Sequence, residues 1–176
     1  MVQSEVLKKI EDLANQVATR EGCKLYDLEF AGGRVLRVYI DKDIAGGAAL
    51  EDCTNVSRGL NLLLDVEDVI PGGQYHLEVS TPGIERPLRK AWHFKAVQGQ
   101  KIWARLNQNL QSLGAQNKKI AAHKQISEVL HAASDVGVEF HIEDEIVKVP
   151  YEAIEKANVV FEFEALKGKK KRSENV

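Results

Sequence analysis

The stretch HLEVSTPGIERPLRKAWHFK, residues 76–95, determines the domain organisation, because a sheet ends and a different kind of structure begins within it. Residues 76–80 alternate polar and apolar side chains, which predicts a strand. The next four residues are Thr-Pro-Gly-Ile, and proline followed by glycine at the centre of a turn is typical of type II. From Pro87 onward we expect a basic helix, because proline is well tolerated at the first helical position. The stretch is therefore predicted to form a rigid corner between two domains.

The residues before this stretch predict an N-terminal α/β domain. Apolar residues at helical spacing indicate helices over residues 3–20 and 50–65. Two alternating segments on either side of a Gly-Gly pair indicate a β-hairpin over residues 25–41. With the strand over residues 75–80, the order is α-β-β-α-β, and we expect a small sheet with the helices on one face.

The residues after the stretch predict an all-β domain. Short strands are expected at 101–106, 125–130, 136–142 and 146–150, followed by one helical turn and a final strand. Several short strands with little helix are typical of a small barrel. The predicted fold class is α+β with two domains. Its boundaries are expected at 1–87 for the N-terminal domain, 88–99 for a connecting helix, 100–165 for the barrel and 166–176 for a basic disordered tail.

Charge is distributed unevenly along the chain, although the 176 residues together carry only −2. Residues 1–84 hold 8 basic and 14 acidic side chains, a net charge of −6, whereas residues 85–176 hold 16 basic and 12 acidic, a net charge of +4. The sign therefore changes within the opening stretch. Such asymmetry indicates a partner that meets two different surfaces, with nucleic acid among the candidates.

Basic and aromatic side chains are interleaved after the turn, and such a mixture can bind RNA by neutralising phosphates and stacking on bases. The candidate RNA-binding residues are Arg86, Arg89 and Lys90, together with Lys169, Lys170, Lys171 and Arg172 of the tail. Leu88, Trp92 and Trp103 are expected in the core, because large apolar side chains are mostly buried. The alternatives are that the cations form only a solvated rim and that the tail only keeps the protein soluble.

The sequence shows no pattern for a catalytic or metal site. Ser80 has no evident histidine base, and the stretch lacks the glycine-rich loop and lysine of a nucleotide-binding P-loop. The five histidines show no metal-ligand spacing, and acidic clusters such as residues 143–145 lie at turns, where solvated carboxylates are ordinary. Two distant cysteines favour a reduced, cytoplasmic protein, and no apolar run is long enough to span a membrane. We therefore expect a non-enzymatic monomer without metal or cofactor.

Three blocks of the sequence resemble the bacterial ribosome maturation factor RimP family. They are RVYIDKD at residues 37–43, LEDCTNVSRGLNLLLD at 50–65 and YHLEVSTPGIERPL at 75–88. The family's turn motif falls on Ser80, Pro82, Gly83, Arg86, Pro87 and Leu88, and its second block falls on Asp52, Cys53, Ser57 and Arg58. Thr81 and Glu85 stand where the family pattern leads us to expect Ser and Asp.

The resemblance implies an N-terminal α/β domain joined to a C-terminal SH3-like barrel. It also implies an assembly factor for the small (30S) ribosomal subunit, one that binds the immature particle through rRNA and through a ribosomal protein near the decoding centre. One alternative is a general RNA-binding or RNA-chaperone module that acts off the ribosome. A protein–protein adaptor without RNA contact is another, and it would be favoured if the cations proved buried or paired.

Overall fold

The computed structural model describes residues 4–32 and 34–162, so the predicted tail at 166–176 and its four candidate cations lie outside the described residues. The chain divides into two compact units, Met1–Gly83 and Ile84–Val176. The first combines helices with a small sheet and the second is built on a separate antiparallel sheet, which makes the fold α+β as expected. The domain boundaries drawn from the sequence stay predictions.

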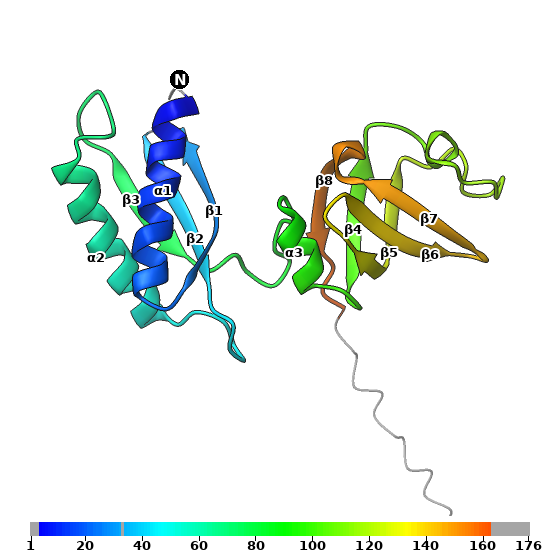
Figure 1. The fold of residues 1–176 in the computed structure, drawn as a ribbon, viewed down its shortest axis with the longest axis horizontal. Helices are drawn as coiled ribbons and strands as arrows, with labels where there is room; N and C mark the ends of the chain where they lie inside the picture. Colours follow the sequence, from blue (N-terminus) through cyan, green and yellow to red (C-terminus); the bar gives the residue numbers. More distant parts are fainter. Residues whose placement is uncertain (1–3, 33, 163–176) are drawn as a thin grey trace, which may run out of the picture. The chain divides into compact units, whose positions relative to one another are not determined.

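The first unit has the predicted α-β-β-α-β order (Figure 1). Its elements are α1 (Ser4–Arg20), β1 (Lys24–Ala31), β2 (Val35–Asp41), α2 (Leu50–Val66) and β3 (His76–Ser80). β1 and β2 form the expected antiparallel hairpin, and β3 pairs with β2 in parallel after the chain has crossed over through α2. The three strands are therefore ordered β1-β2-β3.

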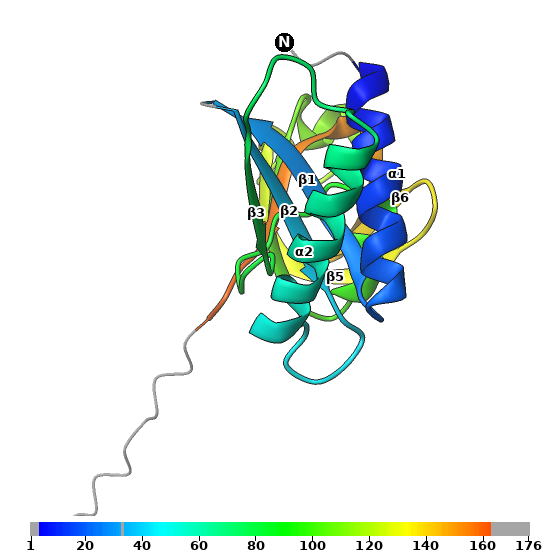
Figure 2. The same ribbon diagram turned by 90° about the vertical axis from the view of Figure 1, so that its left-hand side faces the viewer.

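One apolar layer holds the first unit together. α1 buries Ile10, Ala14 and Val17, which lie on one stripe of the helix, against the inward side chains of the sheet. Figure 2 shows α1 and α2 on the same side of the three strands, as predicted. Cys53 on α2 is 8% exposed and packs as a small apolar residue.

The second unit is a five-stranded antiparallel sheet whose strands begin and end close to the predicted positions. Its elements are α3 (Ala91–Ala96), β4 (Lys101–Leu106), η1 (Leu110–Leu113), β5 (Gln125–Ala133), β6 (Gly137–Ile142), β7 (Glu145–Pro150), η2 (Tyr151–Ala153) and β8 (Ile154–Val159). The order is β7-β6-β5-β4-β8, with Phe140, Ile102 and Leu130 fully buried on the inner face. The strand pairings describe an open sheet with β7 and β8 at its ends, so the predicted barrel closure stays a prediction.

The connection between β4 and β5 is better anchored than its polar sequence indicates. It contains η1, and Leu110, Ala115 and Ile120 are buried in the core of the unit. The Glu145 carboxylate at the start of β7 accepts hydrogen bonds from the backbone N–H of Gln116 at 2.7 Å and of Asn117 at 3.1 Å. The connection is therefore held both by apolar burial and by a carboxylate from a distant strand.

Candidate nucleic-acid interface

The turn after β3 has the backbone conformation that its sequence requires. Gly83 has φ of +79°, in the left-handed region that glycine adopts without steric cost. This agrees with the type II turn predicted for Thr-Pro-Gly-Ile. Gly83 is also the last residue of the first unit.

The prediction of a helix that begins at Pro87 is wrong, because residues 86–88 instead extend the sheet of the second unit. Pro87 bridges Asn158 of β8 in antiparallel fashion. The Val159 N–H donates to the Arg86 carbonyl at 3.1 Å, and the Leu88 N–H donates to the Ala157 carbonyl at 2.8 Å. Pro87 is therefore at a position that donates no backbone hydrogen bond to the paired strand. Proline, which lacks an N–H, is tolerated at such positions of a sheet.

The predicted connecting helix over residues 88–99 is reduced to the short α3, which begins at Ala91. His93, only 1% exposed, fixes its start. Its Nδ1 accepts hydrogen bonds from the backbone N–H of Arg89 at 3.1 Å and of Lys90 at 3.3 Å. A histidine ring therefore satisfies backbone donors at the helix N-terminus and holds the two basic residues in a defined backbone conformation.

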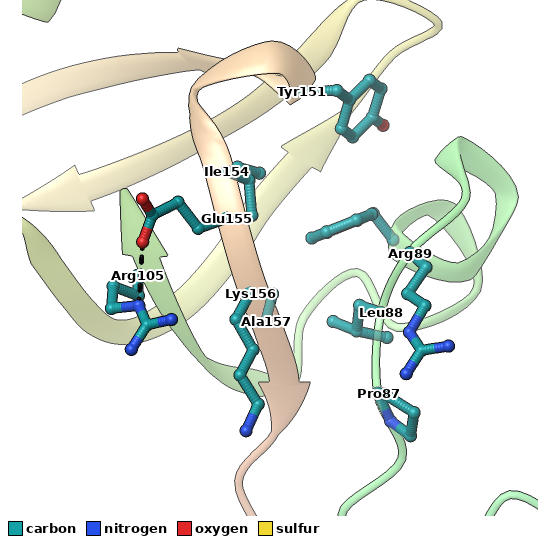
Figure 3. A pocket seen from close by; sticks show the side chains of 10 residues that line it. Pro87, Leu88, Arg89, Arg105, Tyr151, Ile154, Glu155, Lys156 and Ala157 are labelled. Atoms are coloured by element: carbon teal, nitrogen blue, oxygen red, sulfur yellow. Dashed lines mark hydrogen bonds and ion pairs between the residues drawn. The ribbon is translucent and has the colours of Figure 1, made fainter. Parts of the chain in front are cut away.

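A pocket of about 380 Å³ lies in the second unit beside this segment. We call it the basic pocket; it is lined by Pro87, Leu88, Arg89, Phe94, Arg105, Tyr151, Ile154, Glu155, Lys156 and Ala157. Figure 3 shows Arg89 extending from the segment before α3, whereas Lys156 and Ala157 come from β8. Leu88 and Phe94 are 3% and 2% exposed and belong to the core, so the pocket has an apolar base and a basic rim.

Two polar groups at the basic pocket are already engaged. Arg105 donates from Nε to the Glu155 carboxylate at 2.9 Å. The Tyr151 hydroxyl donates to the Ser134 carbonyl at 2.8 Å, and burial raises the pKa of Tyr151. The tyrosine therefore remains a neutral donor at physiological pH.

Several cations near the predicted interface form ion pairs. Besides Arg105 with Glu155, Lys95 pairs with Asp135 and Lys101 pairs with Glu162. All three pairs are solvent-exposed, and exposed pairs contribute little to stability because water and salt screen them. A phosphate group can therefore compete for these cations at little cost.

The structure places the predicted residues in two groups. Arg86, Arg89 and Lys90 lie in the second unit, where Arg89 is exposed at the rim of the basic pocket and the other two are half-buried. Ser80, Pro82 and Gly83 belong to the first unit. The core prediction is confirmed for Leu88 but wrong for Trp92 and Trp103, which are half-buried and outside the buried core cluster.

Lys156 joins Arg89 at the same pocket and was not predicted from the sequence. The alternation along β8 could have indicated that Lys156 is exposed, because Ala157 and Val159 point inward. The contact between β8 and residues 86–88 carried no such signal, because it joins segments about 70 residues apart and sequence periodicity reports only local structure.

The first unit carries a hollow of different character. This acidic hollow, of about 770 Å³, is lined by Asn61, Leu64, Asp65, Asp68, Ile70, Pro71, Gly72, Gly73, Gln74, Tyr75 and His76. The Arg34 side chain holds its outer loop by donating to the carbonyls of Pro71 at 3.0 Å, Gly73 at 3.0 Å and Gln74 at 2.7 Å. The Tyr75 hydroxyl lies 3.3 Å from Asp65, and burial together with this carboxylate raises the pKa of Tyr75 to about 12.

The basic pocket and the acidic hollow present charged side chains of opposite sign. Cations over an apolar base suit phosphates and bases, whereas carboxylates around a hollow suit a basic partner. Within residues 4–32 and 34–162, no group of three or more His, Cys, Asp or Glu is placed to hold a metal ion. No helix in the same residues is long and apolar enough to cross a membrane.

The family model for the RimP N-terminal domain matches the sequence over residues 13–85, which is most of the first unit. Residues 13–85 are therefore similar to the N-terminal domain of the RimP family, whose members are ribosome maturation factors that associate with the small ribosomal subunit. The matched segment includes Ser80, Pro82 and Gly83 and ends just before Arg86 and Pro87. The predicted resemblance to this family is therefore confirmed, and the basic pocket lies beyond the matched residues.

Proposed function

We propose that this protein is a non-enzymatic assembly factor that promotes maturation of the 30S subunit by binding the immature particle. The observation that carries the proposal is the match of residues 13–85 to the RimP N-terminal domain. In this proposal the second unit contacts rRNA, and the first unit contacts a small-subunit ribosomal protein near the decoding centre. The protein acts as a cytoplasmic monomer.

The proposed RNA contact centres on Arg86, Arg89 and Lys90. Hydrogen bonds to β8 and to His93 hold their backbone, so less conformational entropy is lost when they meet phosphates. Lys156 adds a further cation at the basic pocket. In the tail, Lys169, Lys170, Lys171 and Arg172 would add salt-sensitive attraction that does not depend on sequence.

The proposed protein contact uses the acidic first unit. Residues 1–84 carry a net charge of −6, and the acidic hollow presents Asp65 and Asp68. Complementary charge speeds encounter with a basic ribosomal protein and fixes the orientation of binding. The exposed Leu62 and Val66, one turn apart on α2, lie close in sequence to these carboxylates and can add apolar contact area.

We also propose that the sheet of the second unit closes into an SH3-like barrel. The buried residues of its core are apolar, and register shifts opposite Arg105/Leu106 and between Leu130 and Ala132 bend β8 and β5. Residues 86–88 cover the outer edge of β8, which leaves β7 as the strand that would complete the closure.

Charge reversal at the basic segment tests the RNA contact. We expect the double variant Arg86→Glu, Arg89→Glu to bind immature 30S particles about tenfold more weakly or worse, because two cations that neutralise phosphates are replaced by anions that repel them. The plot of log affinity against log salt should become less steep by about one for each phosphate that the variant no longer neutralises. Co-sedimentation at several salt concentrations measures both effects.

The matched control is the double variant Lys118→Glu, Lys119→Glu, which makes the same charge change at two exposed residues of the same unit that do not line the basic pocket. Circular dichroism establishes that the variants are folded. If the folded double variant binds as the unaltered protein does, the basic segment is architectural only, and an adaptor without RNA contact becomes the better explanation.

A further inference from the structure

Two histidines that lie ten residues apart in sequence come together on the second unit. The ring centroids of His131 on β5 and His141 on β6 are 3.9 Å apart, with 33° between the ring planes. Both residues are exposed. The structure gives neither imidazole a hydrogen bond to another described residue, so their ring nitrogens remain available to a ligand.

The backbone of the hairpin produces this pairing. Leu130 pairs with Phe140, and both are fully buried on the inner face of the sheet, so the residues that follow each of them face outward. The register shifts between Leu130 and Ala132, which makes His131 the extra residue of a β-bulge. A bulge re-aims the side chain that it carries, and here it brings His131 against His141.

We propose that His131 and His141 form a binding site for a divalent transition-metal ion of the zinc and nickel type. Imidazole nitrogen is a preferred ligand of these ions, at about 2.0–2.1 Å. Two nitrogens on one tetrahedral ion therefore lie about 3.3 Å apart. The ring centroids are 3.9 Å apart and the two residues stand on paired strands, so rotation of the side chains can bring one nitrogen of each ring to that separation. This proposal is independent of the proposed contact with the ribosome.

The composition of the site sets its expected affinity. No group of three potential ligands occurs in the described part of the chain, so water completes the coordination sphere. Two protein ligands give a micromolar site, weaker than the four-ligand sites that hold structural zinc. Cys23 and Cys53 are buried in the first unit, and burial raises the pKa of both thiols, which disfavours the thiolate form that binds metal.

Calorimetric titration of Zn²⁺ into the untagged, reduced full-length protein tests the site. We expect one ion per chain with micromolar affinity. His131→Gln and His141→Gln should each weaken binding by about tenfold or more, because each removes one of the two ligands. His123→Gln, which replaces an exposed histidine of the same unit outside the pair, should leave binding unchanged.

Paramagnetic Ni²⁺ supplies a second readout that does not require substitution. In amide NMR spectra of the unaltered protein, we expect the resonances around residues 131 and 141 to broaden first. Absence of zinc binding at millimolar ion, a His131→Gln or His141→Gln variant that binds zinc as tightly as the unaltered protein, or broadening centred elsewhere would each overturn the proposal.

Discussion

At Gly137, strands β6 and β7 approach so closely that a side chain has no room. A Cβ atom there would lie 2.5 Å from the Val149 carbonyl oxygen and 2.9 Å from the Pro150 Cα. These are backbone atoms of the paired strand and cannot move aside as a flexible side chain could. We predict that Gly137→Ala destabilises the second unit by about 1–3 kcal/mol, the usual cost of overpacking.

Urea unfolding followed by circular dichroism measures this change. Gly32→Ala is the matched control, because a Cβ at Gly32 meets nothing within 4 Å. Equal unfolding midpoints for Gly137→Ala and the unaltered protein would show that the two strands can separate without cost.

The residue types of the turn predicted its conformation correctly, whereas those of the next segment led to a helix that does not begin at Pro87. The Pro82-Gly83 pair specifies its conformation locally, since proline fixes one φ and glycine permits a positive one. Pro87 suits a helix start and also a sheet position that needs no N–H. Only the contact with Asn158 of β8 decides between them, and that contact is not encoded near Pro87 in the sequence.

Among the helices and strands, the start of α2 is stabilised by a carboxylate with a lowered pKa. Asp52 accepts hydrogen bonds from Lys42 Nζ at 2.8 Å and from the Ala49 N–H, also at 2.8 Å. The lysine and then the backbone donor hold the pKa of Asp52 below its ordinary value of 3.8. The ionised carboxylate thus ties the loop after β2 to the first turn of the helix.

This interaction predicts a pH-dependent contribution to stability. Because the pKa of Asp52 is lower in the folded state, its contribution is complete above the ordinary value and disappears as pH falls through the lowered pKa. Asp52→Asn should therefore lower the melting temperature at neutral pH, and its difference from the unaltered protein should shrink in acid. Thermal melts from pH 7 to the acid limit measure the difference, and a gap that is constant with pH would contradict this role for the charge.

The strands and helices were predictable because their burial is periodic along the sequence, as in β6, where Val138, Phe140 and Ile142 are buried. The anchoring of the connection between β4 and β5 could not be predicted from periodicity, because it depends on Glu145 from a later strand. The contact between the rings of His131 and His141 could not be predicted either, because it depends on a β-bulge in β5. Periodicity predicts elements, whereas sites depend on how elements are paired.

Across the whole molecule, the two units divide the charge between them. The residues of the first unit carry −6 and those of the second carry +4, and the sign changes where the units divide. An immature ribosomal particle offers both negative rRNA and basic proteins. A protein with one acidic and one basic unit can bind such a particle through both, whereas naked RNA repels the acidic unit.

Sedimentation of the unaltered protein with immature 30S particles, mature 30S subunits and naked rRNA is the most direct test of the proposed function. We expect preferential binding to the immature particle, because only there are rRNA and an accessible basic protein presented together. Equal binding to naked rRNA would contradict the proposal and favour a general RNA chaperone that acts off the ribosome.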